Sequence, residues 1–267
     1  MAVDTMLKIA LDAGHHRYTS GKRCLKSIDP AQTREWVLND RIARLVEREL
    51  ERYDCTVLRV DDVTGETDVA LASRVQAANV WKADVYVSIH HNAGINGGAG
   101  GGLVVYTAPD ASPQAKAVQR AMYERVVEHT GLKGDRATPL ASARLYVLTN
   151  THMPAVLGEF GFMDSTTDVP IIRSDRFALQ AARGVVEALV QVYSLQERED
   201  TMTQERFEAM LAQWLRRQEQ QPESGWSRMS EAAAAGFTDG SRPGAFATRE
   251  EVATMLVAAL EQKAAGV

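Results

Sequence analysis

Six histidines are the side chains best suited to metal binding or proton transfer in this sequence, and four of them form two adjacent pairs. His15 and His16 follow the apolar run IALDAG, and His90 and His91 follow the run VYVSI. Each pair therefore stands where a short apolar segment ends. In open α/β sheets, ligands bind outside the carboxyl ends of the strands. Imidazoles from two such ends can therefore converge on one point, although the pairs lie far apart in the sequence.

Two glutamates are the matching acidic candidates. Glu159 stands in the otherwise apolar run PAVLGEFGF, where an ionised carboxylate is costly unless it is paired or bound to a metal. Taken alone, this residue fits a catalytic acid or base and a buried structural carboxylate equally well. Glu35, in TREWVLND, stands at the start of a predicted helix and is well placed to act as a third metal ligand.

Two imidazoles, one carboxylate and an open fourth position are typical of catalytic zinc, which acidifies a bound water and polarises a carbonyl group. The helical zinc motif HExxH is absent from the sequence, so the ligands of such a site must come from separate elements. The residue types thus favour a zinc site that is assembled from distant segments.

The other candidates have simpler interpretations. We expect His16 and His91 to orient their neighbours. His129 follows a helical segment, where an imidazole offsets the helix dipole, and His152 has at most a minor role beside the substrate. The glycine-rich run at residues 92–103 lacks the phosphate-binding pattern GxxxxGK[ST] and leads into a strand, so it predicts a flexible loop beside a cleft.

The hydrophobic pattern indicates which elements must position these residues. Short apolar runs typical of strands occupy residues 7–13, 55–60, 84–93, 102–108, 144–148 and 154–160. Helical spacing of apolar residues occurs over residues 38–53, 113–128 and 177–193. The alternation of strands with helices predicts an α/β fold with a mostly parallel twisted sheet and helices on both of its faces.

The composition changes near residue 195, where the polar stretch QEREDTMTQE begins. A chain of 267 residues suggests one full domain and a smaller one, and its 45% hydrophobic content allows a sizeable core. We therefore predict a catalytic domain over residues 1–195 and a small helical C-terminal domain over residues 196–267.

The net charge, the lengths of the apolar runs and the N-terminal sequence exclude some classes of function. The 30 Lys and Arg against 35 Asp and Glu give a formal net charge of −5, which does not suit a nucleic-acid-binding protein. No apolar run reaches the ~18 residues of a membrane span, and the N-terminus has no signal-peptide pattern. We expect a protein that is made in the cytoplasm and not inserted into a membrane, with Cys24 and Cys55 as unpaired thiols.

Three motifs, DAGHH followed by REW, SIHHNA, and PAVLGEFGFMDS, resemble in order and spacing those of the zinc-dependent N-acetylmuramoyl-L-alanine amidases of bacterial autolysins and phage endolysins. The resemblance extends over residues 7–193 and includes the segment LASRVQAAN. It implies that His15, Glu35 and His90 bind Zn²⁺ and that Glu159 is catalytic.

The sequence departs from the family pattern at two positions. His16 stands where the first motif usually has glycine, and Gly158 stands where the residue before the catalytic glutamate is usually β-branched. Neither departure removes one of the four residues that the resemblance implicates.

The family likeness implies a peptidoglycan hydrolase that cleaves the amide between N-acetylmuramic acid and L-alanine in a muramyl peptide. Without an export signal, we expect a phage endolysin that acts on the cell wall after its release. A mother-cell autolysin of a sporulating bacterium shares this chemistry and stays open as an alternative. A non-catalytic wall-binding protein on the amidase fold, and a zinc hydrolase acting on another amide or ester, also stay open.

The C-terminal segment over residues 226–260 resembles a single S-layer-homology-like repeat. This resemblance implies binding to the cell wall. A small helical cap or a self-association module, which would make the protein a homo-oligomer, is the alternative interpretation.

Overall fold

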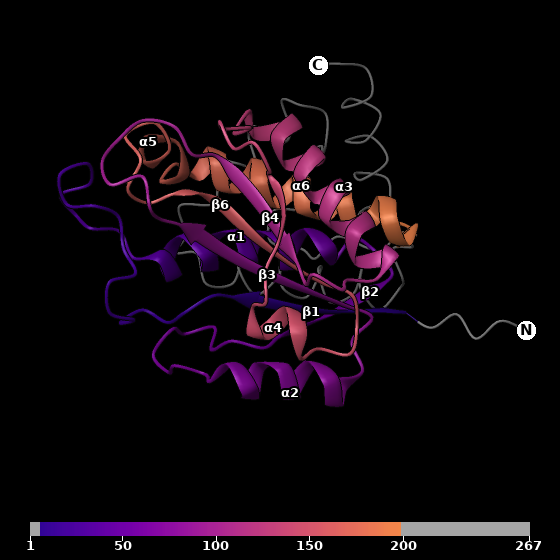
Figure 1. The fold of residues 1–267 in the computed structure, drawn as a ribbon. Coiled ribbons are helices and arrows are strands. Elements are labelled where there is room, and N and C mark those ends of the chain that lie inside the picture. The colour runs from indigo at the N-terminus through magenta and orange to yellow at the C-terminus, as the bar shows by residue number, and fades with distance from the viewer. Residues whose placement is uncertain (1–5, 199–267) are drawn as a thin grey trace, which may run out of the picture. The chain divides into compact units, whose positions relative to one another are not determined.

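In the computed structural model, which describes residues 6–198, a six-stranded sheet carries helices on both faces (Figure 1). The strands are β1 (Leu7–Ala13), β2 (Cys55–Arg59), β3 (Val85–Asn92), β4 (Leu103–Thr107), β5 (Leu140–Ser142) and β6 (Ala155–Phe162). The helices are α1 (Glu35–Leu50), α2 (Leu71–Trp81), α3 (Pro113–Thr130), α4 (Tyr146–Thr149), α5 (Val169–Ile172) and α6 (Asp175–Tyr193).

The sheet is mostly parallel, with the strand order β2-β1-β3-β6-β4-β5. The strands β2, β1, β3 and β6 are parallel, whereas β4 pairs antiparallel with β6, and β5 runs parallel to β4. The predicted fold class is confirmed. The carboxyl ends of β1, β3 and β6 therefore lie side by side at one edge of the sheet, which is where ligands bind in open α/β sheets.

Helices α1, α3 and α6 cover one face of the sheet, and α2 and α4 cover the other (Figure 1). Ser112 and Ser174 begin α3 and α6 as N-caps, because each hydroxyl accepts a backbone N–H of the first turn. Pro113 follows at the first position of α3, where its missing N–H costs nothing.

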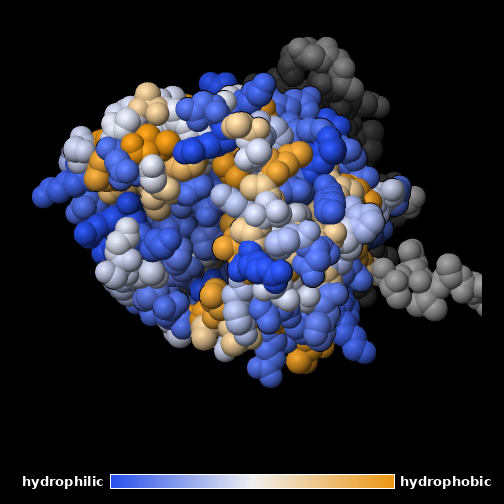
Figure 2. All heavy atoms as spheres, viewed as in Figure 1, coloured by the Kyte–Doolittle hydropathy of each residue, from blue (hydrophilic) through white to orange (hydrophobic). Residues whose placement is uncertain are grey.

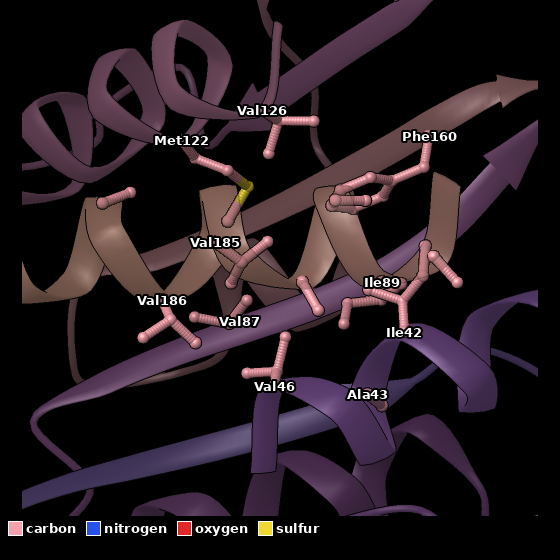
Figure 3. Packing of buried hydrophobic residues seen from close by; sticks show 14 of the residues in the cluster. Ile42, Ala43, Val46, Val87, Ile89, Met122, Val126, Phe160, Val185 and Val186 are labelled. Carbon is pink, nitrogen blue, oxygen red and sulfur yellow. The ribbon is translucent and has the colours of Figure 1, made fainter. Parts of the chain in front are cut away.

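The larger core lies between the sheet and helices α1, α3 and α6 (Figure 3). Figure 3 shows apolar side chains of the three helices meeting those of β3 and β6: Ile42, Ala43, Val46, Met122, Val126, Val185 and Val186 from the helices, and Val87, Ile89 and Phe160 from the strands. Alternate residues of β3 and β6 point to the opposite face, where a smaller core includes Tyr86 and Leu157.

One predicted strand is wrong. The run at residues 144–148 ends in the short helix α4, and the nearby strand is β5, which the sequence analysis missed. Val147 and Leu148 of α4 are buried in the smaller core. A short apolar run fits a buried strand and a buried helical turn equally well, because periodicity needs more residues to separate them.

The described chain extends slightly beyond the predicted domain boundary at residue 195. The carbonyl of Gln196 accepts the N–H of Asp54 at 3.0 Å, and the N–H of Arg198 donates to the carbonyl of Arg52 at 2.7 Å. The predicted C-terminal helices and the repeat-like segment lie outside the described residues.

The face of the described part that Figure 2 shows is mostly hydrophilic, with hydrophobic residues in small separate groups. None of the helices within residues 6–198 combines the length and the apolar character needed to cross a bilayer. Cys24 and Cys55 are both buried and free, as the sequence predicted.

Candidate metal centre

The side chains of His15, Glu35 and His90 meet at the carboxyl edge of the sheet. His15 lies in the loop after β1, Glu35 is the first residue of α1, and His90 lies near the end of β3. One ligand atom from each residue lies within 4.8 Å of the other two. Glu35 Oε1 is 3.3 Å from His15 Nε2 and 3.0 Å from His90 Nδ1. The three residues form a group that can hold a metal ion.

The turn after β1 brings His15 against His90. The N–H of Gly14 donates to the carbonyl of Ile89 at 3.0 Å, which ties the turn to β3. A Cβ atom on Gly14 would lie 2.0 Å from His90 Cε1, so only glycine fits at this position. The rings of His15 and His90 meet edge to face with their centroids 4.9 Å apart. The glycine of DAGHH is therefore required by the packing of the two imidazoles.

The group holds its carboxylate in the ionised form. Glu35 is completely buried, and burial alone would raise its pKa, but the contacts with His15 and His90 outweigh burial and hold the pKa well below its usual range. Burial alone would lower the pKa of His90, but the nearby carboxylates of Glu35 and Glu159 raise it. The ionised carboxylate of Glu35 therefore favours a positive charge beside it.

A metal ion fits this group on two observations. His15 Nε2 and Glu35 Oε2 are buried and have no hydrogen-bond partner within residues 6–198. Buried polar atoms almost always have a partner, so two orphaned atoms in one cluster indicate a ligand. Two imidazole nitrogens and one carboxylate oxygen form a donor set that suits Zn²⁺ with one position left for water or substrate.

Glu159 lies on β6 beside this group. It pairs in register with His90 on the neighbouring parallel strand, so both side chains emerge on the same face of the sheet. Glu159 Oε2 is buried without a hydrogen-bond partner among the described residues. Burial, reinforced by the charge of Glu35 and opposed by His90, raises the pKa of Glu159 to about 7.

A structural carboxylate in the same region behaves differently. Asp12 on β1 accepts a hydrogen bond from Arg74 Nη1 at 2.6 Å and another from Ser88 Oγ at 2.8 Å, so both of its oxygens are paired. Glu159 Oε2 has no such partner among residues 6–198, and a pKa near neutrality suits an acid or base in a reaction. Glu159 therefore meets the chemical requirements of an acid or base in a way that Asp12 does not.

The neighbouring histidines lie outside the group. His16 Nδ1 is 2.7 Å from Thr19 Oγ1 and 3.5 Å from Asp68 Oδ1. His91 is buried, and its Nδ1 lies 2.7 Å from Asn39 Oδ1. Burial lowers the pKa of His91 to about 3, which favours the neutral ring. Because the amide oxygen of Asn39 can only accept, Nδ1 is the protonated nitrogen and donates to it. Both contacts agree with the prediction that His16 and His91 orient their neighbours.

The two isolated histidines do not belong to the group either. His129 lies in the last turn of α3, as the dipole argument requires, and its Nε2 lies 2.8 Å from Glu187 Oε2. His152 is exposed in the loop before β6, where its backbone N–H donates to Asn79 Oδ1 at 2.9 Å.

The glycine-rich loop between β3 and β4 is tethered at several points. The N–H groups of Gly94 and Asn96 both donate to Asp164 Oδ2 at 2.8 Å, and the N–H of Gly102 donates to Asp168 Oδ2 at 2.7 Å. The predicted flexible loop is thus fastened to the segment that follows β6. Its glycines supply N–H groups that two carboxylates can approach closely.

Three polar residues beside the group were not predicted from the sequence. Lys22 Nζ lies 3.7 Å from Glu35 Oε2 on the exposed side. Asn39 stands one helical turn after Glu35, and Arg74 belongs to the segment LASRVQAAN. The spacing of Asn39 from Glu35 was a usable signal, because residues four apart share a helix face. Nothing in the sequence connected Lys22 or Arg74 with the histidines.

Fold and site together define an α/β protein with a candidate metal centre at the ends of its parallel strands. Residues 9–191 match the family model for N-acetylmuramoyl-L-alanine amidases. The chain is 31% identical over 192 residues to the N-acetylmuramoyl-L-alanine amidase CwlM of Bacillus licheniformis, with 71% of this chain and 70% of that protein covered. The chain therefore belongs to the N-acetylmuramoyl-L-alanine amidase family.

Other relatives come from two biological settings. The chain is 32% identical over 197 residues to an endolysin of Bacillus phage SPP1, covering 70% of this chain and 66% of the endolysin. It is 29% identical over 192 residues to a sporulation-specific N-acetylmuramoyl-L-alanine amidase of Bacillus subtilis, covering 72% and 70% of the two chains. A crystal structure of an N-acetylmuramoyl-L-alanine amidase from Clostridium difficile 630 matches with a TM-score of 0.63 and 25% identity, over 70% of this chain and 97% of that one.

Proposed function

We propose that this protein is a zinc-dependent peptidoglycan amidase that hydrolyses the bond between the lactyl group of N-acetylmuramic acid and L-alanine. In this proposal His15, Glu35 and His90 bind Zn²⁺, and Glu159 is the general base and acid. One observation supports it most: three ligand atoms lie within 4.8 Å of one another, and Glu159 lies in register with His90 on the next strand, with no hydrogen-bond partner for its Oε2 in the described part of the chain.

Each residue has a defined part in the reaction. A zinc ion held by such a donor set acidifies water and polarises a carbonyl oxygen. Glu159 accepts a proton from the water whose oxygen attacks the lactyl carbonyl carbon. It then returns the proton to the amide nitrogen as the carbon–nitrogen bond breaks, which leaves a lactyl carboxylate and a free L-alanine amine. In the metal-free protein burial raises the pKa of Glu159 to about 7, which suits a group that both accepts and returns a proton near neutral pH.

We propose a phage endolysin as the biological setting, because the SPP1 endolysin is a relative at 32% identity. The sporulation-specific relative at 29% identity supports the second candidate, a mother-cell autolysin with the same chemistry. A neighbouring gene for a small membrane-permeabilising protein is expected for the endolysin, and a position among sporulation genes is expected for the autolysin.

We propose that residues 196–267, of which all but the first three lie outside the described residues, form a module that binds the cell wall. Self-association through this segment is the alternative. Co-sedimentation of the full chain with purified walls tests the first function, and analytical ultracentrifugation tests the second. Retention on walls by a monomeric chain would support wall binding through one repeat-like segment.

The decisive test of the chemistry is the variant Glu159→Gln, assayed on purified peptidoglycan by the appearance of new L-alanine amino termini. We expect near-complete loss of activity with zinc content unchanged, because the amide cannot accept a proton but leaves the ligands in place. Glu124→Gln is the matched control, since Glu124 is an exposed residue of α3. It should keep wild-type activity.

Each other outcome identifies an alternative. If Glu159→Gln digests walls at the wild-type rate, the proposed mechanism is wrong. If the wild type binds walls, contains no metal and releases no amino termini, the chain is a non-catalytic wall-binding protein. If zinc is present but only other amides or esters are cleaved, the substrate assignment is wrong.

A further inference from the structure

Three consecutive backbone carbonyls in the turn after β1 are held by buried side chains from two helices. Arg74 Nη1 of α2 donates to the carbonyl of Ala13 at 2.9 Å, and Arg74 Nη2 donates to the carbonyl of His15 at 2.9 Å. Asn39 Nδ2 of α1 donates to the carbonyl between them, that of Gly14, at 3.0 Å. The turn that carries His15 is therefore clamped from both faces of the sheet.

The clamped backbone adopts a conformation that side chains normally avoid. His15 has φ of +69°, in the left-handed region, which is uncommon for any residue other than glycine. A backbone in this region persists only where its surroundings hold it, and such positions are concentrated at functional sites. In this conformation His15 Nε2 lies 3.3 Å from Glu35 Oε1 and its ring meets that of His90.

Arg74 is itself held rigidly. It is buried, its Nη1 pairs with Asp12 Oδ1 at 2.6 Å, and its Nε donates to the carbonyl of Val69 at 2.9 Å. Ser88 Oγ donates to the second oxygen of Asp12. The planar guanidinium therefore presents its donors to Ala13 and His15 at fixed positions, which a lysine ammonium cannot reproduce.

Asn39 is fixed by the strand that carries the second histidine. His91 donates its Nδ1–H to Asn39 Oδ1 at 2.7 Å, so the amide must turn its Nδ2 toward Gly14. The backbone N–H of His91 also approaches Glu35 Oε1 at 3.3 Å. The contacts of Asn39 thus connect the segments that contain all three members of the candidate metal group.

We infer that Arg74 and Asn39 are positioning residues, which hold His15 in its left-handed conformation and so preorganise the group for metal binding. The inference rests on the proposed role of His15, Glu35 and His90 as ligands. Removal of residues that orient metal ligands typically weakens metal affinity about 10–100-fold. Loss of the hydrogen bonds of Arg74 or of Asn39 should therefore weaken metal binding while the three ligands themselves remain.

The experiment measures Zn²⁺ affinity of the metal-free full chain by competition with a chromophoric chelator, and the absorption spectrum after loading with Co²⁺. Arg74→Lys keeps the positive charge opposite Asp12 but loses the planar guanidinium that donates to two carbonyls. Asn39→Leu removes the side-chain amide and keeps a similar side-chain volume. We expect a rise in the Zn²⁺ dissociation constant of about 10–100-fold in each variant. The Co²⁺ spectrum should also change, because the ligand geometry changes.

Gln119→Met is the matched control. Gln119 Nε2 is buried and donates to the carbonyls of Val105 and Ala141, both at 2.7 Å, so the substitution removes hydrogen bonds of the same kind on β4 and β5. We expect it to lower the melting temperature and leave Zn²⁺ affinity unchanged. Equal weakening in the control would show that loss of general stability explains the effect, and the inference would be wrong.

The variant His15→Ala distinguishes a failure of this inference from a failure of the proposed function. If the wild type binds Zn²⁺, His15→Ala does not, and both clamp variants bind within about twofold of wild type, the inference is overturned and the proposed ligands stand. If the wild type binds no metal, or His15→Ala binds as tightly, the proposed function fails first. Should Arg74→Lys not fold, Asn39→Leu decides alone.

Discussion

At the scale of single residues, Gly158 limits which side chain can stand beside Glu159, the proposed general base. It directly precedes Glu159, and a Cβ atom there would lie 2.5 Å from Phe160 Cε2. Phe160 is completely buried in the larger core, so its ring cannot move away freely (Figure 3). We predict that Gly158→Val, which restores the residue type usual in the family, destabilises the protein by about 1–3 kcal/mol. Urea unfolding measures this loss, and kcat should fall because Glu159 is displaced.

The double variant with Phe160→Leu is the control for this prediction. Leucine is shorter than the phenylalanine ring, so the loss in the Gly158→Val, Phe160→Leu protein should be smaller than the sum of the two single losses. Strictly additive losses would contradict a clash between the two positions. The sequence motif predicted that Glu159 is catalytic, but the reason for its unusual neighbour Gly158 required the packing of β6.

At the scale of elements, the hydrogen bonds that hold the glycine-rich loop to Asp164 predict that the loop opens at acidic pH. Burial alone would raise the pKa of Asp164, but the N–H donors of Asn96 and Gly94 outweigh it and lower the pKa. A carboxylate whose pKa is lower in the folded than in the unfolded state stabilises the fold at pH values above its unfolded pKa of about 3.9. This stabilisation is lost as the pH falls through the lower pKa of the folded state. We expect the amides of Gly94 and Asn96 to begin to lose exchange protection at about pH 5 and to go on losing it as the pH falls below about 4.

The amide of Gly131 provides the control in the same exchange experiment. It donates to the carbonyl of Val127 at 2.8 Å, a bond without a titrating partner. Its protection, corrected for the intrinsic exchange rate, should stay constant over this range. Unchanged protection at Gly94 would show that Asp164 does not hold the loop.

Some elements and contacts could be predicted from the sequence, and others could not. Long helices such as α1 and α6 were predicted because the helical spacing of their apolar residues is sustained over many residues. The strands that end at the histidine pairs were predicted because each is a short apolar run. The helix α4 was mistaken for a strand because four residues are too few to show a period. The tether of the glycine-rich loop was invisible because Asp164 lies on a different segment, brought close only by the pairing of β3 with β6.

At the scale of the whole molecule, a bound metal ion should stabilise the fold that assembles its ligands. The three candidate ligands come from β3, α1 and the loop after β1, so binding favours the folded state in which they meet. We predict that dialysis against a chelator abolishes hydrolysis and lowers the melting temperature by several degrees, and that Zn²⁺ restores both. Glu35→Gln should show no such shift on chelation. A chelated wild type with full activity would contradict the metal requirement.

The domain proposal predicts where the chain can be shortened. The carbonyl of Gln196 and the N–H of Arg198 bond to the backbone of Asp54 and Arg52, at the turn between α1 and β2. A chain that ends at Arg198 should keep the fold and hydrolyse soluble muramyl peptides at the full-length rate, but should lose retention on walls. A chain that ends at Leu195 loses two backbone hydrogen bonds, worth about 0.5–1.5 kcal/mol each, so its melting temperature should be several degrees lower with activity retained. Failure of the longer chain to fold or to hydrolyse would show that the catalytic part is not an independent domain.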